Sequence, residues 1–151
     1  MSKTYADWLK EYYPETASEA ATKSRENNDS GLYAAKHSIK KWEGARKKVL
    51  DKHDMYADGT ELCSNARNAR NFAIIDFWSR NCSLCQYTVL GDCFYCPGTT
   101  ANGRNCHDAY ESMIATDSPR KMLIWLRKTV KYLESKQSPV NTISVIPAMQ
   151  N

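Results

Sequence analysis

Five of the six cysteines lie within residues 82–106, and their spacing constrains the fold of this chain more than any other feature. They form two C-x2-C pairs and a last cysteine followed by histidine: Cys82 and Cys85, Cys93 and Cys96, then Cys106 and His107. A two-residue spacer lets both sulfurs of a pair face one point, so two pairs supply the four soft ligands of a tetrahedral Zn²⁺. The spacing predicts one structural Zn²⁺ in a loop-rich knuckle lobe over residues 82–107.

The six candidates exceed the four ligands that one ion needs, so the ligand set stays open. The first choice is the two pairs Cys82, Cys85, Cys93 and Cys96; in the alternative set, Cys106 or His107 replaces Cys93 or Cys96. An Fe–S cluster also accepts four thiolates, although the spacing matches neither ferredoxin pattern. Disulfides or uncoordinated thiols are a further alternative, and Cys63 is expected to be a buried small hydrophobe.

A catalytic zinc needs an open coordination position and a nearby general base. The deaminase signature places His-x-Glu before Pro-Cys-x2-Cys; here no His-x-Glu exists, and Pro97 follows its cysteine pair. The chain also lacks a Gly-rich phosphate loop and a nucleophile elbow. We therefore expect a structural metal, no enzymatic activity and no small-molecule substrate.

Length and composition favour one small domain, mainly α-helical, over residues 1–137, with a flexible tail at 138–151. No run of 18 apolar residues exists, so no membrane span is expected. The N-terminus lacks the apolar centre of a signal peptide, which predicts a cytoplasmic protein with reduced cysteines. The net charge of +4 is mildly basic.

Apolar residues at helical spacing predict the helical elements, and a Pro or Gly near the end of several of them predicts where they stop. Residues 15–30 are small and polar and are expected to be a connector, and a short hairpin is expected around residues 87–94. Residues 72–78 are apolar nearly all round, which predicts the most buried helix, leading into Cys82. The expected helices are 4–13, 30–43, 45–53, 61–79, 108–116 and 119–136.

Two expected helices carry basic faces. Residues 36–52 hold seven Lys and Arg residues, including Lys40 and Lys47, and a second basic stripe follows residue 119. Such faces could bind nucleic-acid phosphates or could simply be solvated helix surface. His37 and His53 stand among lysines and are expected to be exposed. The second stripe comprises Arg120, Lys121, Arg127, Lys128 and Lys131.

Residues 37–44 (HSIKKWEG) and 49–53 (VLDKH) are followed by 82–85 (CSLC), 93–97 (CFYCP) and Cys106. Over roughly residues 29–110 this arrangement resembles small cysteine-rich, zinc-binding proteins of tailed bacteriophages. The sequence departs from that pattern after Cys106, where Asp108-Ala109-Tyr110 replaces a trailing Pro-Tyr pair. The resemblance implies a phage origin and a metal, and it transfers no activity.

These features lead to a functional hypothesis and an alternative. In the first, a zinc-stabilised phage accessory protein binds a host or defence protein in the bacterial cytoplasm, as an inhibitor for example, through the lobe aromatics Phe94, Tyr95 and Tyr87. In the alternative, the basic helices, with Lys40 and Lys47, bind nucleic acid while the lobe aromatics stack on bases.

Overall fold

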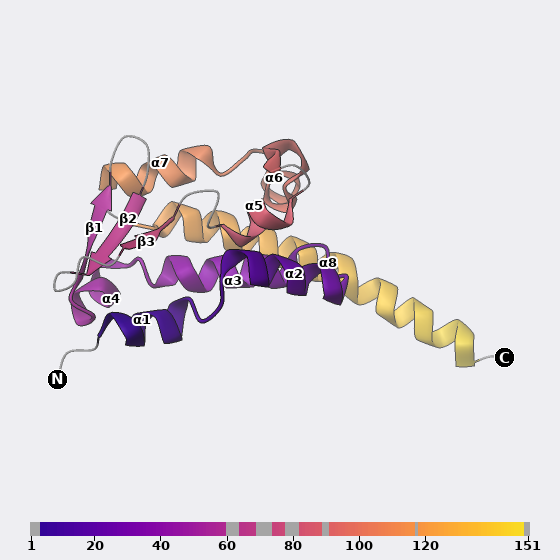
Figure 1. Ribbon diagram of the computed structural model, residues 1–151. Helices are drawn as coiled ribbons and strands as arrows, with labels where there is room; N and C mark the ends of the chain where they lie inside the picture. The colour runs from indigo at the N-terminus through magenta and orange to yellow at the C-terminus, as the bar shows by residue number, and fades with distance from the viewer. Residues whose placement is uncertain are drawn as a thin grey trace.

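The computed structural model describes residues 4–59, 64–68, 74–77, 82–88, 91–116 and 118–149. This part of the chain is mainly helical, as the sequence predicts (Figure 1). Its helices are α1 (Tyr5–Tyr12), α2 (Ala17–Asn27), α3 (Leu32–Glu43), α4 (Lys47–Lys52), α5 (Ser83–Tyr87), α6 (Pro97–Asn102), α7 (His107–Thr116) and α8 (Arg120–Met149), with a 3₁₀ turn, η3, at Cys93–Tyr95.

The first two helices begin at capping boxes. Ser2 and Thr4 are both candidate caps for α1, and it is Thr4 that accepts a hydrogen bond from the backbone N–H of Asp7 and caps the helix. Thr16 and Glu19 form the same arrangement for α2, so the prediction of a connector over residues 15–30 is wrong. The buried face of α2 consists of alanines and Ser24, which let the helix lie close to α3 and α5. Such small residues give almost no hydrophobic periodicity, which explains the error.

The core gathers around two tryptophans of the N-terminal half. The Trp8 side chain is 0% exposed and its indole N–H donates to the Gly44 carbonyl at 2.9 Å. Trp42 is also buried, and Leu126 of α8 joins the same cluster. Gly44 is required at this contact because a Cβ there would lie 2.7 Å from the Trp8 ring. Together these contacts join α1, α3 and α8 in one packed unit. We call this unit, together with α2, the helical body.

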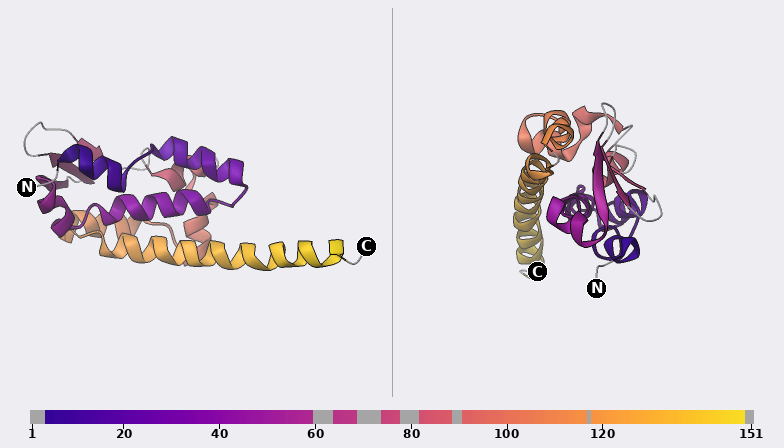
Figure 2. Two further views of the ribbon diagram at one scale, coloured as in Figure 1. Left: turned by 90° about the horizontal axis from the view of Figure 1, so that it is seen from below. Right: turned by 90° about the vertical axis from the view of Figure 1, so that its left-hand side faces the viewer.

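Helices α3 and α8 lie side by side and antiparallel (Figure 2). Ion pairs mark both ends of their contact: Lys36 Nζ lies 3.6 Å from Glu134, and Arg127 lies 3.5 Å from Glu43. The predicted core face of α8 is largely confirmed, since Met122, Leu126 and Leu133 are buried and Val130 is half-buried.

The helix predicted over residues 61–79 is wrong. The chain instead forms strands β1 (Met55–Gly59), β2 (Ser64–Asn68) and β3 (Ile74–Asp76), paired antiparallel in the order β1-β2-β3. A short apolar run with β-branched isoleucines fits a strand as well as a helix, and pairing decides between them. Phe77, directly after β3, is buried against Trp42, whereas Phe72, Trp78 and Cys63 lie outside the described residues.

Two other segments also differ from expectation. Helix α8 continues to Met149, through the segment expected to be a flexible tail. Pro139 suggested a stop there, because a proline inside a helix removes one backbone donor and crowds the carbonyl four residues earlier; the backbone of α8 nevertheless stays helical past it. The metal lobe (residues 82–107) is built of α5, η3 and α6 rather than a hairpin and loops, and it stands near one end of α3, away from the sheet (Figure 1).

Candidate metal centre

Each C-x2-C pair of the metal lobe sits at the start of a short helix. Cys82 is the extended N-cap of α5, and Cys96 is the extended N-cap of α6. The backbone N–H of Cys85 faces the Cys82 sulfur, and the N–H groups of Gly98 and Thr99 face the Cys96 sulfur. N–H groups aimed at sulfur stabilise the thiolate form that binds metal.

All five lobe cysteines converge on two adjoining cavities. The larger, of about 370 Å³, is lined by Cys82, Cys85, Cys93 and Cys106. The smaller, of about 20 Å³, is lined by Cys85, Cys93, Cys96 and Cys106. Three cysteines therefore line both cavities, and the fold brings together the whole set that the sequence spacing predicts.

The thiols influence one another's ionisation. The pKa of Cys82 is lowered to about 6, chiefly by a hydrogen bond from the Cys85 side chain. The pKa of Cys85 is raised, chiefly because that bond holds its proton, and burial raises the pKa of Cys96. Burial also raises the pKa of Cys106 to about 12, with a further contribution from the neighbouring thiols. Ionising further thiols beside the Cys82 thiolate would need a cation to balance their charge, which a divalent metal would supply.

The sulfurs are gathered but not arranged as a closed coordination shell. In the described part of the chain, no group of three or more His, Cys, Asp or Glu side chains is spaced to hold a metal. The five lobe cysteines are free thiols. The Cys82 sulfur instead accepts a hydrogen bond from the Cys85 thiol and lies 3.8 Å from Ser38 Oγ. The donor set of five thiols and one imidazole consists of the ligand types that Zn²⁺ prefers.

A hydrogen-bonded chain links Cys82 to the helical body. Ser38 Oγ on α3 lies 2.7 Å from Ser83 Oγ, and Ser83 donates to the Ala34 carbonyl at 2.6 Å. His37 Nδ1 lies 3.1 Å from Ser83 Oγ. The His37 side chain is buried, so its predicted exposure is wrong: Lys36 and Lys40 are exposed on other faces of α3, while Lys41, one turn further along, is buried like His37.

The other ring nitrogen, His37 Nε2, lies 2.9 Å from the Glu15 carbonyl. A carbonyl only accepts, so Nε2 carries a proton. Burial lowers the pKa of His37. The histidine therefore ties the segment before α2 to the start of the metal lobe.

Lys41 and Trp42 complete the face of α3 that meets the lobe. Lys41 is 3% exposed, with its ammonium 4.8 Å from the Tyr13 ring centroid and 4.9 Å from that of Phe77. Its charge also contributes to lowering the pKa of Cys82. The sequence placed Lys41 on the solvated side with Lys36 and Lys40, which is wrong for Lys41. The roles of Lys41, Ser38 and Ser83 were not predicted from the sequence. A usable signal was that Ser38 and Lys41 lie three residues apart in the motif HSIKKW, on one helix.

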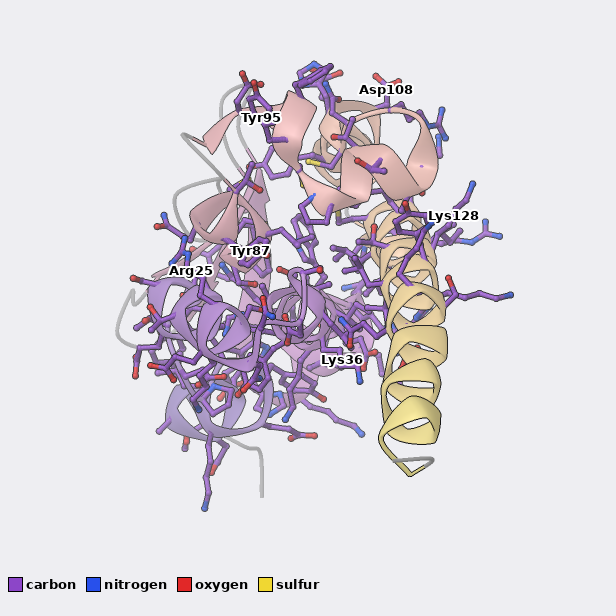
Figure 3. The ribbon with its side chains drawn as sticks, turned by 90° about the vertical axis from the view of Figure 1, so that its right-hand side faces the viewer. Arg25, Lys36, Tyr87, Tyr95, Asp108 and Lys128 are labelled. Atoms are coloured by element: carbon purple, nitrogen blue, oxygen red, sulfur yellow. The ribbon has the colours of Figure 1, made fainter. Side chains whose placement is uncertain are left out.

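The lobe aromatics divide into exposed and packed side chains. Phe94 is 76% exposed and Tyr95 is 57% exposed, which confirms the expectation for Phe94. Their rings meet edge to face with centroids 5.2 Å apart. Tyr87 is half-buried, with the Arg25 guanidinium 5.7 Å from its ring centroid (Figure 3). Gly31 lies beneath it, in a left-handed conformation with φ of 98°.

The predicted basic residues Lys40 and Lys47 are exposed. Lys47 lies 3.4 Å from Asp51 of its own helix. The contact between α3 and α8 brings the two basic helices together, but carboxylates lie between the cations, as the Lys36–Glu134 and Arg127–Glu43 pairs show.

The other two histidines, His53 and His107, also have structural partners. His53 is 1% exposed and its Nδ1 lies 2.7 Å from the Val49 carbonyl, so its predicted exposure is wrong. His107 lines the larger thiol cavity and lies 3.1 Å from Glu111.

Comparison of the chain with protein-family models, with curated proteins and with solved structures finds no match. Within the residues that the structure describes, no helix is both long enough and apolar enough to cross a membrane.

Proposed function

We propose that this chain is a zinc-stabilised, non-enzymatic interaction protein of a bacteriophage, which binds a host or defence protein in the bacterial cytoplasm. The observation that carries the metal is the convergence of five cysteines on two adjoining cavities. The phage origin and the host partner rest on the sequence resemblance alone.

One Zn²⁺ is held by four of the five lobe thiols. Cys85, Cys93 and Cys106 line both cavities, and Cys85 belongs to both the first and the alternative ligand set. His107 is exposed and pairs with Glu111, which makes it a weaker ligand candidate than the thiols. Four thiolates leave the ion no open position for substrate, so the metal is structural.

Elemental analysis of protein purified without added metal tests this centre. We expect about one zinc per chain, and Co²⁺ substitution should give the absorption of a tetrahedral thiolate site. Stoichiometric iron with a visible charge-transfer band would show that the centre is an Fe–S cluster and not a zinc site.

The partner contact is the pair Phe94 and Tyr95. These rings sit on a three-residue 3₁₀ turn between two cysteines, and metal binding would hold that turn rigid. Rigid exposed aromatic side chains supply much of the energy of protein interfaces. Tyr87 instead packs beside Arg25 and above Gly31, so it does not belong to this contact.

Capture of a partner from host lysate, read by mass spectrometry, compares two double variants at equal zinc content. Phe94→Ala with Tyr95→Ala should abolish capture of the specific protein. Lys40→Gln with Lys47→Gln should leave capture unchanged. Loss in the lysine variant alone, with steep salt dependence, would instead support nucleic-acid binding.

A further inference from the structure

A second surface lies where the end of the lobe meets α8. It is a hollow of about 560 Å³ between α8 and the junction of α6 and α7. Figure 3 shows Asp108 and Lys128, which both line it, on the same side of the molecule. We call it the basic groove; its lining residues are Asn102, Arg104, Asn105, Asp108, Ala109, Lys121, Ile124, Trp125 and Lys128.

Helix α8 presents a mixed stripe to the groove. Lys121, Ile124 and Lys128 recur at intervals of three and four residues, so they share one helix face. Ile124 is 54% exposed, a large apolar side chain between two lysines. Arg104, from the turn after α6, is an exposed third cation of the lining.

The cations of the groove differ from those between α3 and α8. Lys36 and Arg127 face carboxylates across the helix contact. Among the residues that the structure describes, Arg104, Lys121 and Lys128 form no ion pair. Asp108 is the single carboxylate of the lining, so the groove keeps an excess of positive charge.

The floor of the groove is held in place by hydrogen bonds. The Trp125 indole N–H donates to the Arg104 carbonyl at 3.1 Å. Asn102 Nδ2 donates to the Trp125 carbonyl at 3.2 Å and lies 3.1 Å from Thr129 Oγ1. The groove is therefore preformed, which lowers the entropic cost of binding a ligand there.

We infer that the basic groove binds an acidic protein segment that places an apolar side chain on Ile124 and carboxylates beside Arg104, Lys121 and Lys128. This inference deepens the proposed function, and it rests on the proposal that the chain binds a protein. Charge complementarity selects the acidic segment, and the exposed isoleucine selects an apolar side chain within it. Nucleic acid fits less well, because Trp125 is only 6% exposed and its ring cannot stack on a base.

The test measures binding of a fluorescein-labelled helical peptide in which Glu and Leu recur at helical spacing, by anisotropy against the full zinc-loaded chain. Lys121→Glu with Lys128→Glu should weaken binding by about tenfold or more, because each reversal replaces attraction by repulsion. Arg120→Glu with Lys131→Glu is the matched control: both residues are exposed on α8 and outside the groove lining, and this variant should bind within about twofold of the parent.

Two further probes complete the test. A peptide with Ser in place of Leu should bind about tenfold more weakly if Ile124 takes an apolar side chain. Equal loss in both charge variants, equal binding of the Ser peptide, or displacement by single-stranded oligo-dT with higher affinity would each overturn the inference. Phe94→Ala with Tyr95→Ala should leave peptide binding unchanged, so the groove and the proposed aromatic contact can fail independently.

Discussion

The helical body and the metal lobe are held together in different ways. In the body, Trp8, Trp42 and Leu126 are at most 3% exposed and pack into one apolar cluster. In the lobe, Leu84 is buried, while Phe94 and Tyr95 face solvent. The lobe helices have five, three and six residues, too short to be stable alone.

This difference shows where each region obtains its stability. The body buries enough apolar surface to fold by the hydrophobic effect. The lobe depends on its attachments to the body and on its cysteines. Two attachments are close contacts at glycine: Gly31 under Tyr87 and Gly98 against Trp125. The third is the hydrogen-bonded chain from His37 to Cys82.

The largest effect should follow loss of the metal. Chelation, or Cys85→Ser, should unfold the lobe and lower the melting temperature markedly. The loss in folding free energy should be smaller than the roughly 10 kcal/mol that zinc contributes in finger peptides, because helical packing also supports the fold. Far-UV circular dichroism should retain most of the helix signal, while hydrogen exchange in residues 82–107 should accelerate. Ser135→Ala, at an exposed site on α8, is the control. An unchanged melting curve would show that the lobe does not need a metal.

A smaller effect is expected at the contact between α6 and α8. A Cβ on Gly98 would lie 1.9 Å from the Trp125 ring, so Gly98→Ala must push α6 away from α8. We expect a loss of about 3 kcal/mol in the free energy of unfolding, measured by urea titration. Thr100→Ala, on the exposed side of α6, should cost far less. Similar losses for the two variants would contradict the packing described.

The link between body and lobe should tune metal affinity. Ser38→Ala removes the hydroxyl 3.8 Å from the Cys82 sulfur and should weaken zinc affinity about tenfold, as loss of an outer hydrogen bond does at other metal sites. Competition with a chromophoric chelator measures this affinity. Ser24→Ala, which removes a buried hydroxyl that accepts from Ala34 N, should lower stability without this change in affinity. Equal affinities would place Cys82 outside the ligand set.

The smallest effect concerns pH. Burial lowers the pKa of His37 below its ordinary value of 6.5, so this histidine binds a proton more readily in the unfolded chain than in the folded chain. The contribution of neutral His37 is complete above pH 6.5 and decreases as the pH falls below it. His37→Gln should flatten the stability profile of the metal-free chain below that pH. A profile as steep as the parent's would assign the acid sensitivity to other groups.

Much of the helical body follows from local patterns. Thr4 and the apolar spacing after it predict α1, and Gly44 predicts the end of α3; the structure confirms both. Helix α2 was not predicted because its buried face consists of alanines and Ser24, and residues this small give no clear hydrophobic periodicity. The strands were missed because the apolar run at residues 72–78 fits two periods, and only pairing with β2 selects one.

By itself, the sequence determined the chemistry of the candidate centre. Two C-x2-C pairs bring sulfurs together through local backbone geometry, which needs no distant contact. Tertiary structure alone decided what surrounds those sulfurs: Ser38 and Lys41 come from a helix forty residues earlier in the chain, and α3 brings them to Cys82. It likewise decided which cations pair across α3 and α8 and which remain open in the basic groove. Those outcomes depend on how helices pack, and sequence spacing within one helix carries no information about its neighbour.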